Sequence, residues 1–584
     1  MRRRMAFACA ALAMATAISG TTAMAAGNGG FKTAQPSMLT AIKSGVTVTP
    51  LLTVGDVFGD GGFRFEAIPD GISLRNRGNG RVDVYVNHET SKVPFPFNTA
   101  TPTASNGESD FDNSQVSALI LNKNSAGVLD GSFVIPSSGG FQRFCSNYLA
   151  TGKEGFDREV LFTNEESPDY VFRQEDSWPP PMGDPNEEEN GVVLALDVKS
   201  RQYHVIYGMG RHNHENNVAI PGFNDLVVLS GDDTFTSGPL TIPPGGPNLE
   251  TSAASQSQLY SYIASDTDSL LADEGDLWAF VSNDANFDDY YDFTPGSTQS
   301  VSGHFIQVPK NIATGKDTDG SELKAADLGY PLPPTDGTWQ RDLRSVAPLG
   351  IDGPQWVLEY WSQLNNVFDF VRVEDIAYDK RPGMGNVVYV VDSGRGTAGV
   401  SQAGRSTNGR VWKMVLDPED PTHVTSLSIA VEGDDNPVKT LGEVHQPDNI
   451  ETTQTGLLLT EDPGSSQQFI AADQGLPNAT TARLWYVPFS GTPQVVVKID
   501  QSADGGPTDV DGRPAGNWGA WETTGIVDAS AAFGPGAFLI NVQAHTLWVE
   551  KALGPDTFID ANSDPDFTYK REGGQLLLLR IPGI

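Results

Sequence analysis

The sequence predicts an all-β fold, a six-bladed β-propeller with long loop insertions on one face. Short segments that are apolar, or that alternate between apolar and polar residues, recur along the chain between Gly, Pro, Asn and Asp residues. Helical periodicity is nearly absent. Acidic residues stand in turns before these segments and at their ends, and this arrangement repeats. A repeated unit of strands with acids at their ends is typical of small sheets arranged around a common axis.

Six repeated units are expected, starting near residues 60, 140, 211, 366, 442 and 520. Each unit begins with an acid-bearing turn, continues with a strand that ends in an acid, and then has a strand with aromatic residues, such as "RVWKMVL". A propeller of 584 residues can be one domain because each blade has its own core, so we expect a single domain over 26–584. A seventh unit within 296–360, or a two-sheet sandwich, is the alternative.

Long insertions are expected near residues 167–190, 234–256 and 284–365. These stretches are rich in Pro, Gly and Asp, which favours loops on the surface of a rigid scaffold. We therefore expect them to decorate one face of the propeller.

The N-terminal segment has the features of an export signal. Three arginines at positions 2 to 4 precede the apolar run "MAFACAALAMATAISG", and Ala23 and Ala25 frame an A-x-A cleavage site. This predicts a signal peptide over 1–25 and a periplasmic or secreted mature protein. A membrane anchor is the alternative, but the run is short for one. We expect a monomer without membrane contact after cleavage.

The charge balance is strongly acidic. The chain has 38 Lys and Arg against 74 Asp and Glu, a formal net charge of −36. This excess argues against a nucleic-acid partner and favours divalent cations, although most of these acids are expected on a solvated surface. Cys9 lies in the expected signal, so Cys145 stays alone and no disulfide within the mature chain is expected.

The recurring acids are candidate metal ligands. In chain order the sets are Asp70 with Glu89, Glu215 with Asp232 and Asp233, Glu374 with Asp392, Asp448 with Glu461 and Asp462, and Glu522 with Gln543 and His545. Calcium takes six to eight oxygen ligands, which carboxylates at a propeller mouth would supply. Any one set could be a solvated turn, and the recurrence is what makes the series specific.

Arg372 is a candidate phosphate ligand. It stands two residues before Glu374, so both side chains can point the same way in an extended chain. The guanidinium fork donates two parallel hydrogen bonds, which suits an oxyanion such as phosphate. An ion pair on a sheet is the alternative.

Together the segments resemble the PhoX-type alkaline phosphatases. The stretches that match, in the family's order and over roughly residues 50 to 490, are "FRFEAIPDGI", "VYVNHE", "FCSNYLATG", "LFTNEES", "GVVLALDV", "GMGRHNHEN", "LSGDD", "LWAFVS", "RVEDIAYD" and "QPDNIE". The resemblance implies an exported, calcium-dependent phosphomonoesterase with a six-bladed propeller.

The resemblance also implies a metal site. Members of the family hold calcium ions and an iron pair with glutamates, an aspartate and a bridging cysteine. Carried over by motif, Glu215, Glu374 and Asp448 are implied metal ligands, and Arg372 is implied to contact phosphate. The family's "TCEE" segment reads "TNEE" here, so Asn164 takes the place of the cysteine and Glu165 and Glu166 follow it.

The replacement of the cysteine bears on the choice of metal, because an amide oxygen cannot bridge two irons as a thiolate does. Calcium is therefore the expected cofactor, and iron is left open. Cys145 matches a different, upstream position of the family and is not an obvious substitute. The predicted catalytic residues are Arg372 and Asn164, and the predicted metal ligands are Glu165, Glu215, Asp232, Glu374, Asp392, Asp448 and Glu461.

Two functions follow as hypotheses. The first is a calcium-dependent phosphoric ester hydrolase, in which metal-activated water or a metal-bound oxygen attacks the phosphate of an ester held by Arg372. The second is a non-catalytic, calcium-stabilised extracellular propeller that acts as a binding or matrix module. No G-x-S-x-G elbow, P-loop or dinucleotide fingerprint is found, which weakens serine hydrolase, NTPase and Rossmann-fold assignments.

Overall fold

The computed structural model describes most of the chain after the expected signal peptide. The described residues are 29–59, 62–89, 113–171, 173, 187–234, 256–335, 339–340, 350–394, 408–433, 442–462, 480–503, 519, 521–550 and 570–584. The expected signal peptide, residues 174–186 and residues 235–255 lie outside this part. No helix of the described residues is long and apolar enough to cross a membrane.

Four sheets of four or five antiparallel strands make up much of the molecule. The first has β5 (Pro69–Asn76), β6 (Arg81–His88), β7 (Gln115–Asn122) and β8 (Val128–Ile135). The second has β9 (Phe144–Ala150), β10 (Val160–Glu165), β13 (Val193–Asp197) and β14 (Gln202–Ile206). The third has β24 (Pro447–Thr452), β25 (Gly456–Glu461), β26 (Arg483–Pro488), β27 (Gln494–Ile499) and β1 (Leu39–Ala41). The fourth has β28 (Glu522–Asp528), β29 (Ala537–Glu550), β30 (Lys570–Arg580) and β2 (Thr47–Thr53).

The remaining large sheet has nine strands and contains two sequential runs. One run is β15 (His214–Ile220), β16 (Leu226–Asp232), β17 (Leu259–Ala264), β18 (Asp276–Ser282) and β19 (Ser300–Gln307). The other is β20 (Val373–Tyr378), β21 (Val387–Asp392), β22 (Arg410–Asp417) and β23 (Asp420–Glu432). The two runs join where β19 pairs with β23 at their outer edges. Short pairs also form between β3 (Val57–Phe58) and β4 (Phe63–Arg64), and between β11 (Tyr170–Val171) and β12 (Glu188–Glu189).

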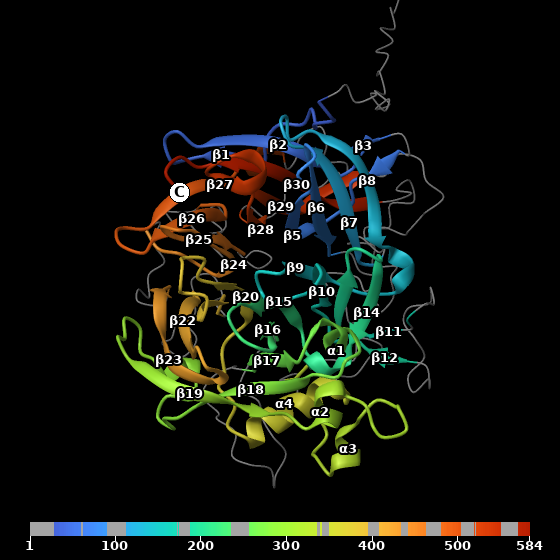
Figure 1. Ribbon diagram of the computed structural model, residues 1–584, viewed down its shortest axis with the longest axis vertical. Coiled ribbons are helices and arrows are strands. Elements are labelled where there is room, and N and C mark those ends of the chain that lie inside the picture. Colours follow the sequence, from blue (N-terminus) through green and yellow to red (C-terminus); the bar gives the residue numbers. More distant parts are fainter. Residues whose placement is uncertain are drawn as a thin grey trace, which may run out of the picture.

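The first strands of these runs form a closed ring. β5 contacts β9, β9 contacts β15, β15 contacts β20, β20 contacts β24, β24 contacts β28, and β28 returns to β5. Figure 1 shows these strands around the centre of the molecule, with the other strands of each sheet outside them. Each expected unit start lies a few residues before one of these strands, and the propeller-like arrangement of mostly β structure is confirmed.

Small apolar cores lie between neighbouring sheets. Val82 and Val84 of β6, for example, pack in one fully buried cluster with Leu539 of β29 and Leu576 of β30. Each interface buries apolar side chains from two sheets, and this burial is the main force that holds such a ring together.

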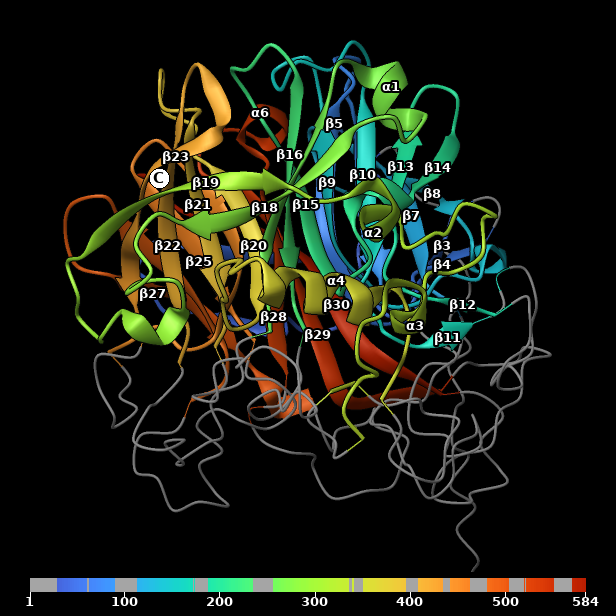
Figure 2. The ribbon, with the colours of Figure 1, turned by 90° about the horizontal axis from the view of Figure 1, so that it is seen from below.

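The segment 284–365, expected as a loop insertion, carries regular structure in its described part. It contains β19 and the helices α2 (Lys310–Thr314), α3 (Ala325–Leu328) and α4 (Pro354–Leu364). Val357, Leu358 and Trp361 of α4 pack with Leu277 of β18 and Ile312 of α2. The helices therefore cover an outer side of the nine-stranded sheet (Figure 2). The other described helices are α1 (Thr267–Leu271) and α6 (Ser530–Phe533).

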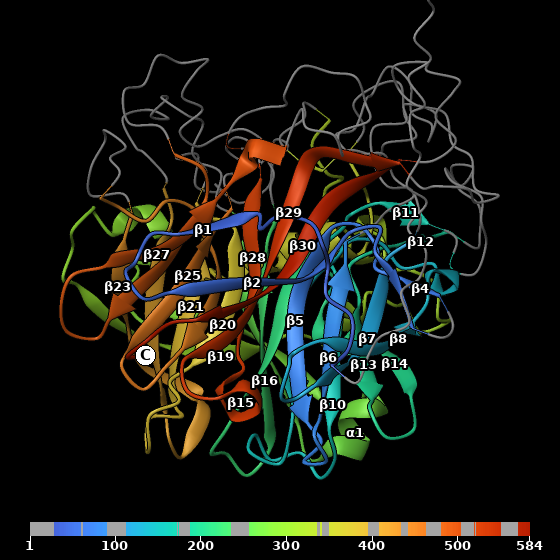
Figure 3. The same ribbon diagram turned by 90° about the horizontal axis from the view of Figure 1, so that it is seen from above.

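Two strands from the N-terminal part of the chain complete sheets from its C-terminal part. β2 pairs antiparallel with β30, and β1 pairs antiparallel with β27. Figure 3 shows β1 and β2, in blue, beside these red and orange strands. The ring is thereby closed by hydrogen bonds between distant parts of the sequence.

Candidate metal centre

A β-bulge begins at the second residue of five of the six ring strands, and the sixth, β28, has its register shift later, between Thr524 and Ile526. In each bulge, two residues of the ring strand lie opposite one residue of its neighbour. The five pairs are Asp70–Gly71, Cys145–Ser146, Glu215–Asn216, Glu374–Asp375 and Asp448–Asn449. Bulges are common next to active sites because they change the direction of a side chain. The first residue of every pair is a carboxylate or a thiol.

Four of these first residues belong to two groups that could hold metal ions, and the fifth, Asp70, accepts a hydrogen bond from Cys145. Candidate ligand atoms of Glu215, Glu374 and Asp448 all lie within 4.8 Å of one another. The same is true of Cys145, Glu166 and Glu215. Glu215 belongs to both groups. The three ligands implied by the family resemblance are thus brought together in the described part of the structure.

We call the residues of these two groups, together with the side chains that contact them, the cluster. A second set of side chains joins the cluster from the strands next to the ring. Glu166 belongs to one of the two groups, and Asp233 Oδ2 lies 2.7 Å from Arg372 Nη2. Ser393 donates a hydrogen bond to Glu374, and Asp462 lies 4.0 Å from Arg372 Nη1. Each of these residues directly follows the last residue of its strand.

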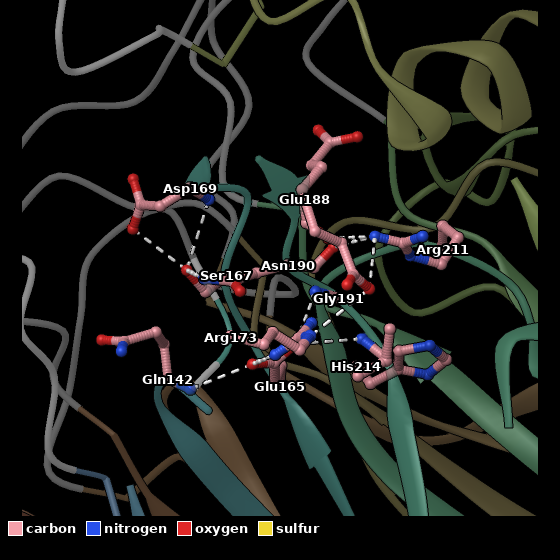
Figure 4. Close-up of polar contacts among 12 residues, drawn as sticks. Gln142, Glu165, Ser167, Asp169, Arg173, Glu188, Asn190, Gly191, Arg211 and His214 are labelled. Atoms are coloured by element: carbon pink, nitrogen blue, oxygen red, sulfur yellow. Dashed lines mark hydrogen bonds and ion pairs between the residues drawn. The ribbon is translucent and has the colours of Figure 1, made fainter. Parts of the chain in front are cut away.

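The four other predicted metal ligands each stand one residue before a member of this second set, and their side chains hydrogen-bond to other groups of the protein. They are Glu165, Asp232, Asp392 and Glu461, and neither metal-binding group contains them. Glu165 accepts two hydrogen bonds of 2.8 Å from Arg173, as Figure 4 shows, and Glu461 accepts bonds of 2.8 and 2.9 Å from Arg483. Successive side chains of a strand point to opposite faces, so an offset of one residue separates these acids from the cluster.

Asn164 also binds the protein frame. Its side-chain amide donates to the backbone carbonyls of His214, at 2.5 Å, and Glu215, at 2.7 Å, and its oxygen accepts from Asn217 at 2.9 Å. The side chain is fully buried. Asn164 therefore binds the backbone at the bulge of β15, and all the hydrogen bonds that the structure shows for its side chain go to protein atoms.

Cys145 lies in the cluster although the sequence analysis set it aside. Its Sγ donates a hydrogen bond of 2.8 Å to Asp70 Oδ2 and it belongs to the group with Glu166 and Glu215. The spacing between an arginine and the residue two positions later in the sequence could have identified Cys145. Arg143 precedes Cys145 by two residues at the start of β9, just as Arg372 precedes Glu374 at the start of β20.

The backbone is strained just before four of the five bulges. Ile68, Arg143, Arg372 and Gln446 have φ values of 47°, 48°, 64° and 44°, and each stands two residues before the first residue of a bulge. Residues other than glycine rarely adopt this left-handed conformation, which costs on the order of 1–3 kcal/mol each and clusters at functional sites. The strain coincides with the side chains that form the cluster.

Burial and mutual repulsion dominate the electrostatics of the cluster. Desolvation, and then neighbouring carboxylates, raise the pKa of Glu215 and Asp448 well above the usual range of carboxyls. Desolvation raises the pKa of Asp70 to about 6, and desolvation with the nearby Asp70 raises that of Glu89 to about 7. So many carboxylates cannot all be charged in a buried site unless cations neutralise them.

Arg372 supplies the main positive charge of this region. Burial alone would lower its pKa, but Asp233 and Glu374 outweigh that effect and raise it. Arg372 Nη2 lies 3.3 Å from Glu374 Oε1. Glu522 Oε1 of the last ring strand, β28, lies 3.4 Å from His545 Nε2 of β29. Burial alone would lower the pKa of His545, but its hydrogen bonds to Glu522 and Glu572 outweigh that effect and raise it.

The bulges also separate the cluster from a cavity of about 380 Å³. This cavity is lined by the later parts of the ring strands, with Tyr148, Tyr378 and Lys380 among its walls. Asn216 and Asp375, the second residues of two bulges, line it as well. Consecutive residues of one strand thus face either the cluster or the cavity.

The metal-free protein is expected to lose stability as the pH rises from about 5 to 8. Asp70 and Glu89, and also Glu189 and Glu359 with pKa values of about 8, have folded-state pKa values above those of the unfolded chain. The folded state then binds more protons than the unfolded state in this range, so the free energy of unfolding falls as they are released. Each unit of pKa shift corresponds to about 1.4 kcal/mol per group.

Thermal unfolding in the presence of a chelator, followed by circular dichroism at pH 5, 6, 7 and 8, measures this dependence. Calcium should restore the melting temperature most strongly at pH 8, because the ionised carboxylates that bind calcium are favoured as the pH rises. A melting temperature that stays constant or rises with pH would contradict the expectation.

Comparisons with known proteins bear on the fold. No protein-family model and no curated protein matches the chain. Among solved structures, PhoX of Pseudomonas fluorescens, in complex with vanadate as a transition-state analogue, is 13% identical with a TM-score of 0.54, over 94% of this chain and 98% of PhoX. The NanB sialidase of Streptococcus pneumoniae is 8% identical with a TM-score of 0.34, over 88% and 68% of the two chains. The chain is therefore similar to PhoX in its fold, over nearly the full length of both proteins.

Proposed function

We propose that the protein is a metal-dependent phosphoric ester hydrolase, with calcium as its main cofactor. The observation that carries the proposal is the position of Arg372, whose guanidinium lies 3.3 Å from Glu374, a member of one of the two metal-binding groups that share Glu215. A cation cluster with an adjacent arginine fork can bind a phosphate ester on several oxygens at once. The similarity of the fold to PhoX supports the same assignment.

The residues present fit metal ions. Glu215, Glu374 and Asp448 offer oxygen atoms only, which suits calcium. The group of Cys145, Glu166 and Glu215 adds a thiol, which suits a softer transition metal such as iron. Iron was left open because Asn164 stands in place of the family's cysteine and Cys145 was not an obvious substitute, but Cys145 offers a thiol within one of the two groups.

The protein's own residues would then divide the work as follows. Glu215, Glu374 and Asp448 would hold the cations, which when bound would neutralise phosphate charge and lower the pKa of a water nucleophile. Arg372 donates to the phosphate oxygens and stabilises the negative charge that develops during transfer. Asp233 and Glu374 orient the guanidinium from two sides, and Ser393 holds Glu374 through its hydrogen bond.

We further propose that the nine-stranded sheet counts as two blades, which makes a six-bladed propeller over 26–584. The ring of six strands and the repeated bulges support this count. Export through the signal peptide 1–25, a periplasmic or secreted location and a monomeric state belong to the same proposal, as does the absence of nucleic-acid partners.

Metal analysis combined with an activity assay tests the function. The purified mature protein should contain calcium by plasma mass spectrometry and should hydrolyse p-nitrophenyl phosphate. Chelation should abolish turnover, and added calcium should restore it if calcium is the main cofactor. Stabilisation by calcium without turnover at any pH would overturn the proposal and favour the non-catalytic propeller.

A further inference from the structure

We infer that Glu165, Asp392 and Glu461 are positioning residues, which hold the side chains of the cluster in place through the turns that precede them. Each carboxylate accepts a hydrogen bond from a backbone N–H three residues before a cluster residue. The donors are Gln142 at 3.0 Å, before Cys145, Val371 at 2.9 Å, before Glu374, and His445 at 2.9 Å, before Asp448.

The same turns are held from a second direction. The residue that follows each carboxylate donates its backbone N–H to the carbonyl of the strained residue in the turn. Glu166 donates to Arg143, Ser393 to Arg372 and Asp462 to Gln446, each at 3.0 Å. Two consecutive residues therefore fix each turn. The carboxylate accepts from the N–H just before the left-handed residue, and the next residue donates to the carbonyl of the left-handed residue itself.

These two hydrogen bonds explain how the strained conformation persists. Arg143, Arg372 and Gln446 are the residues with positive φ in these three turns, and such conformations last only where the surroundings fix them. Once the carboxylate is lost, the turn can relax, and the bulge that begins two residues later then changes its direction. The cluster side chain would move with it.

The three carboxylates differ in what else they bind. Glu165 also binds Arg173, and Figure 4 shows Gln142 and Arg173 around it. Glu461 binds the buried Arg483, so its replacement would leave an arginine without its carboxylate. Asp392 accepts from the backbone N–H groups of Val371 and Gly394, at 2.9 and 3.0 Å. The substitution Asp392→Asn is therefore the sharpest test, since it turns one acceptor into a donor that faces a backbone N–H.

The inference rests on the proposed metal cluster, and metal affinity is its readout. Residues that orient metal ligands from behind typically change affinity by about 10- to 100-fold when they are replaced. We expect Asp392→Asn to weaken the tightest calcium site at least about tenfold in isothermal titration of the chelator-treated protein. Unchanged affinity in a folded Asp392→Asn protein would overturn the inference.

Asp83→Asn is the matched control. Asp83 is also buried, is 3% exposed, and lies 3.2 Å from Arg75 and 2.6 Å from Arg77 at the opposite end of β6 from His88. Its replacement removes a buried carboxylate far from the cluster. We expect a lower melting temperature in Asp83→Asn with calcium affinity within about twofold of the unmodified protein, and a loss as large as that of Asp392→Asn would overturn the inference.

Hydrogen exchange keeps the inference testable if Asp392→Asn does not fold. In the unmodified, metal-free protein, the amides of Gln142, Val371 and His445 should exchange as slowly as those of the adjacent ring strands. Fast exchange at these three amides would overturn the inference. A protein that binds no metal at all would instead overturn the proposed function, while the exchange rates would still report on the turns.

Discussion

Replacing Glu215 with Gln is expected to abolish phosphoester hydrolysis, with a loss of turnover of more than about 10³-fold. Glu215 is the residue that both metal-binding groups share, so its loss affects every cation that they hold. Removal of a single electrostatic contact in an active site typically costs about 10²–10³-fold in kcat, and this change removes more than one. Ser146 donates to Glu215 Oε1 at 2.8 Å, so a folded variant should keep the side chain in place.

Two variants calibrate this result. Asp448→Asn affects one group only, and it should reduce both turnover and metal content less than Glu215→Gln. Glu359 lies outside both groups, and burial raises its pKa to about 8, so Glu359→Gln resembles the protonated side chain at pH 7. Its activity should stay within about twofold. Full activity and full metal content in Glu215→Gln would contradict the shared-ligand arrangement.

Replacing Arg372 with Lys is expected to reduce kcat/KM about 10²–10³-fold while the bound metal remains. Lysine keeps a positive charge, but it is a point charge without the planar fork that matches two phosphate oxygens. It also cannot bridge Asp233 and Glu374 as the guanidinium does, at 2.7 and 3.3 Å. Steady-state kinetics with p-nitrophenyl phosphate, and competitive inhibition by inorganic phosphate, measure the effect.

Arg143→Lys is the matched control for this prediction. Arg143 has the same left-handed backbone and the same position before its cluster residue, but its Nη2 lies 3.1 Å from Asp169. We expect a loss below about tenfold in this variant. A larger loss in Arg143→Lys than in Arg372→Lys would place the phosphate on the β9 side of the cluster and not at β20.

Much of the fold could be predicted because local patterns determine it. The apolar strands and the acids at their ends recur in the sequence, and the expected unit starts precede the ring strands. Glu215, Glu374 and Asp448 could be proposed for the same reason, since each belongs to the recurring series of acids, and Arg372 could be proposed because it stands two residues before Glu374. The helix α4 was missed because one short amphipathic helix, Pro354–Leu364, stands within a segment rich in turn residues.

The other site residues could not be predicted, because the register of the strand pairs decides which side chains face the cluster, and spacing in the sequence does not determine that register. Asp232 and Asp233 are adjacent in the sequence, and only the bulge and the strand pairing decide that Asp233 reaches Arg372. Cys145 was set aside because it matches a different, upstream position of the family, and the series that contains Asp70 and Glu374 was read as carboxylates only. A thiol at a position where other units have carboxylates is visible only once the units are aligned by their bulges.

The pairing of β2 with β30 has a consequence for the order of biosynthesis. β30 separates β2 from β29 in the fourth sheet, so this sheet is complete only once β30 has been synthesised. The last ring strand, β28, belongs to that sheet. The ring therefore closes, and the cluster can enclose cations, only after β2 has paired with a strand made more than 500 residues later. Under the proposed function, the protein takes its metal from the compartment in which this pairing occurs.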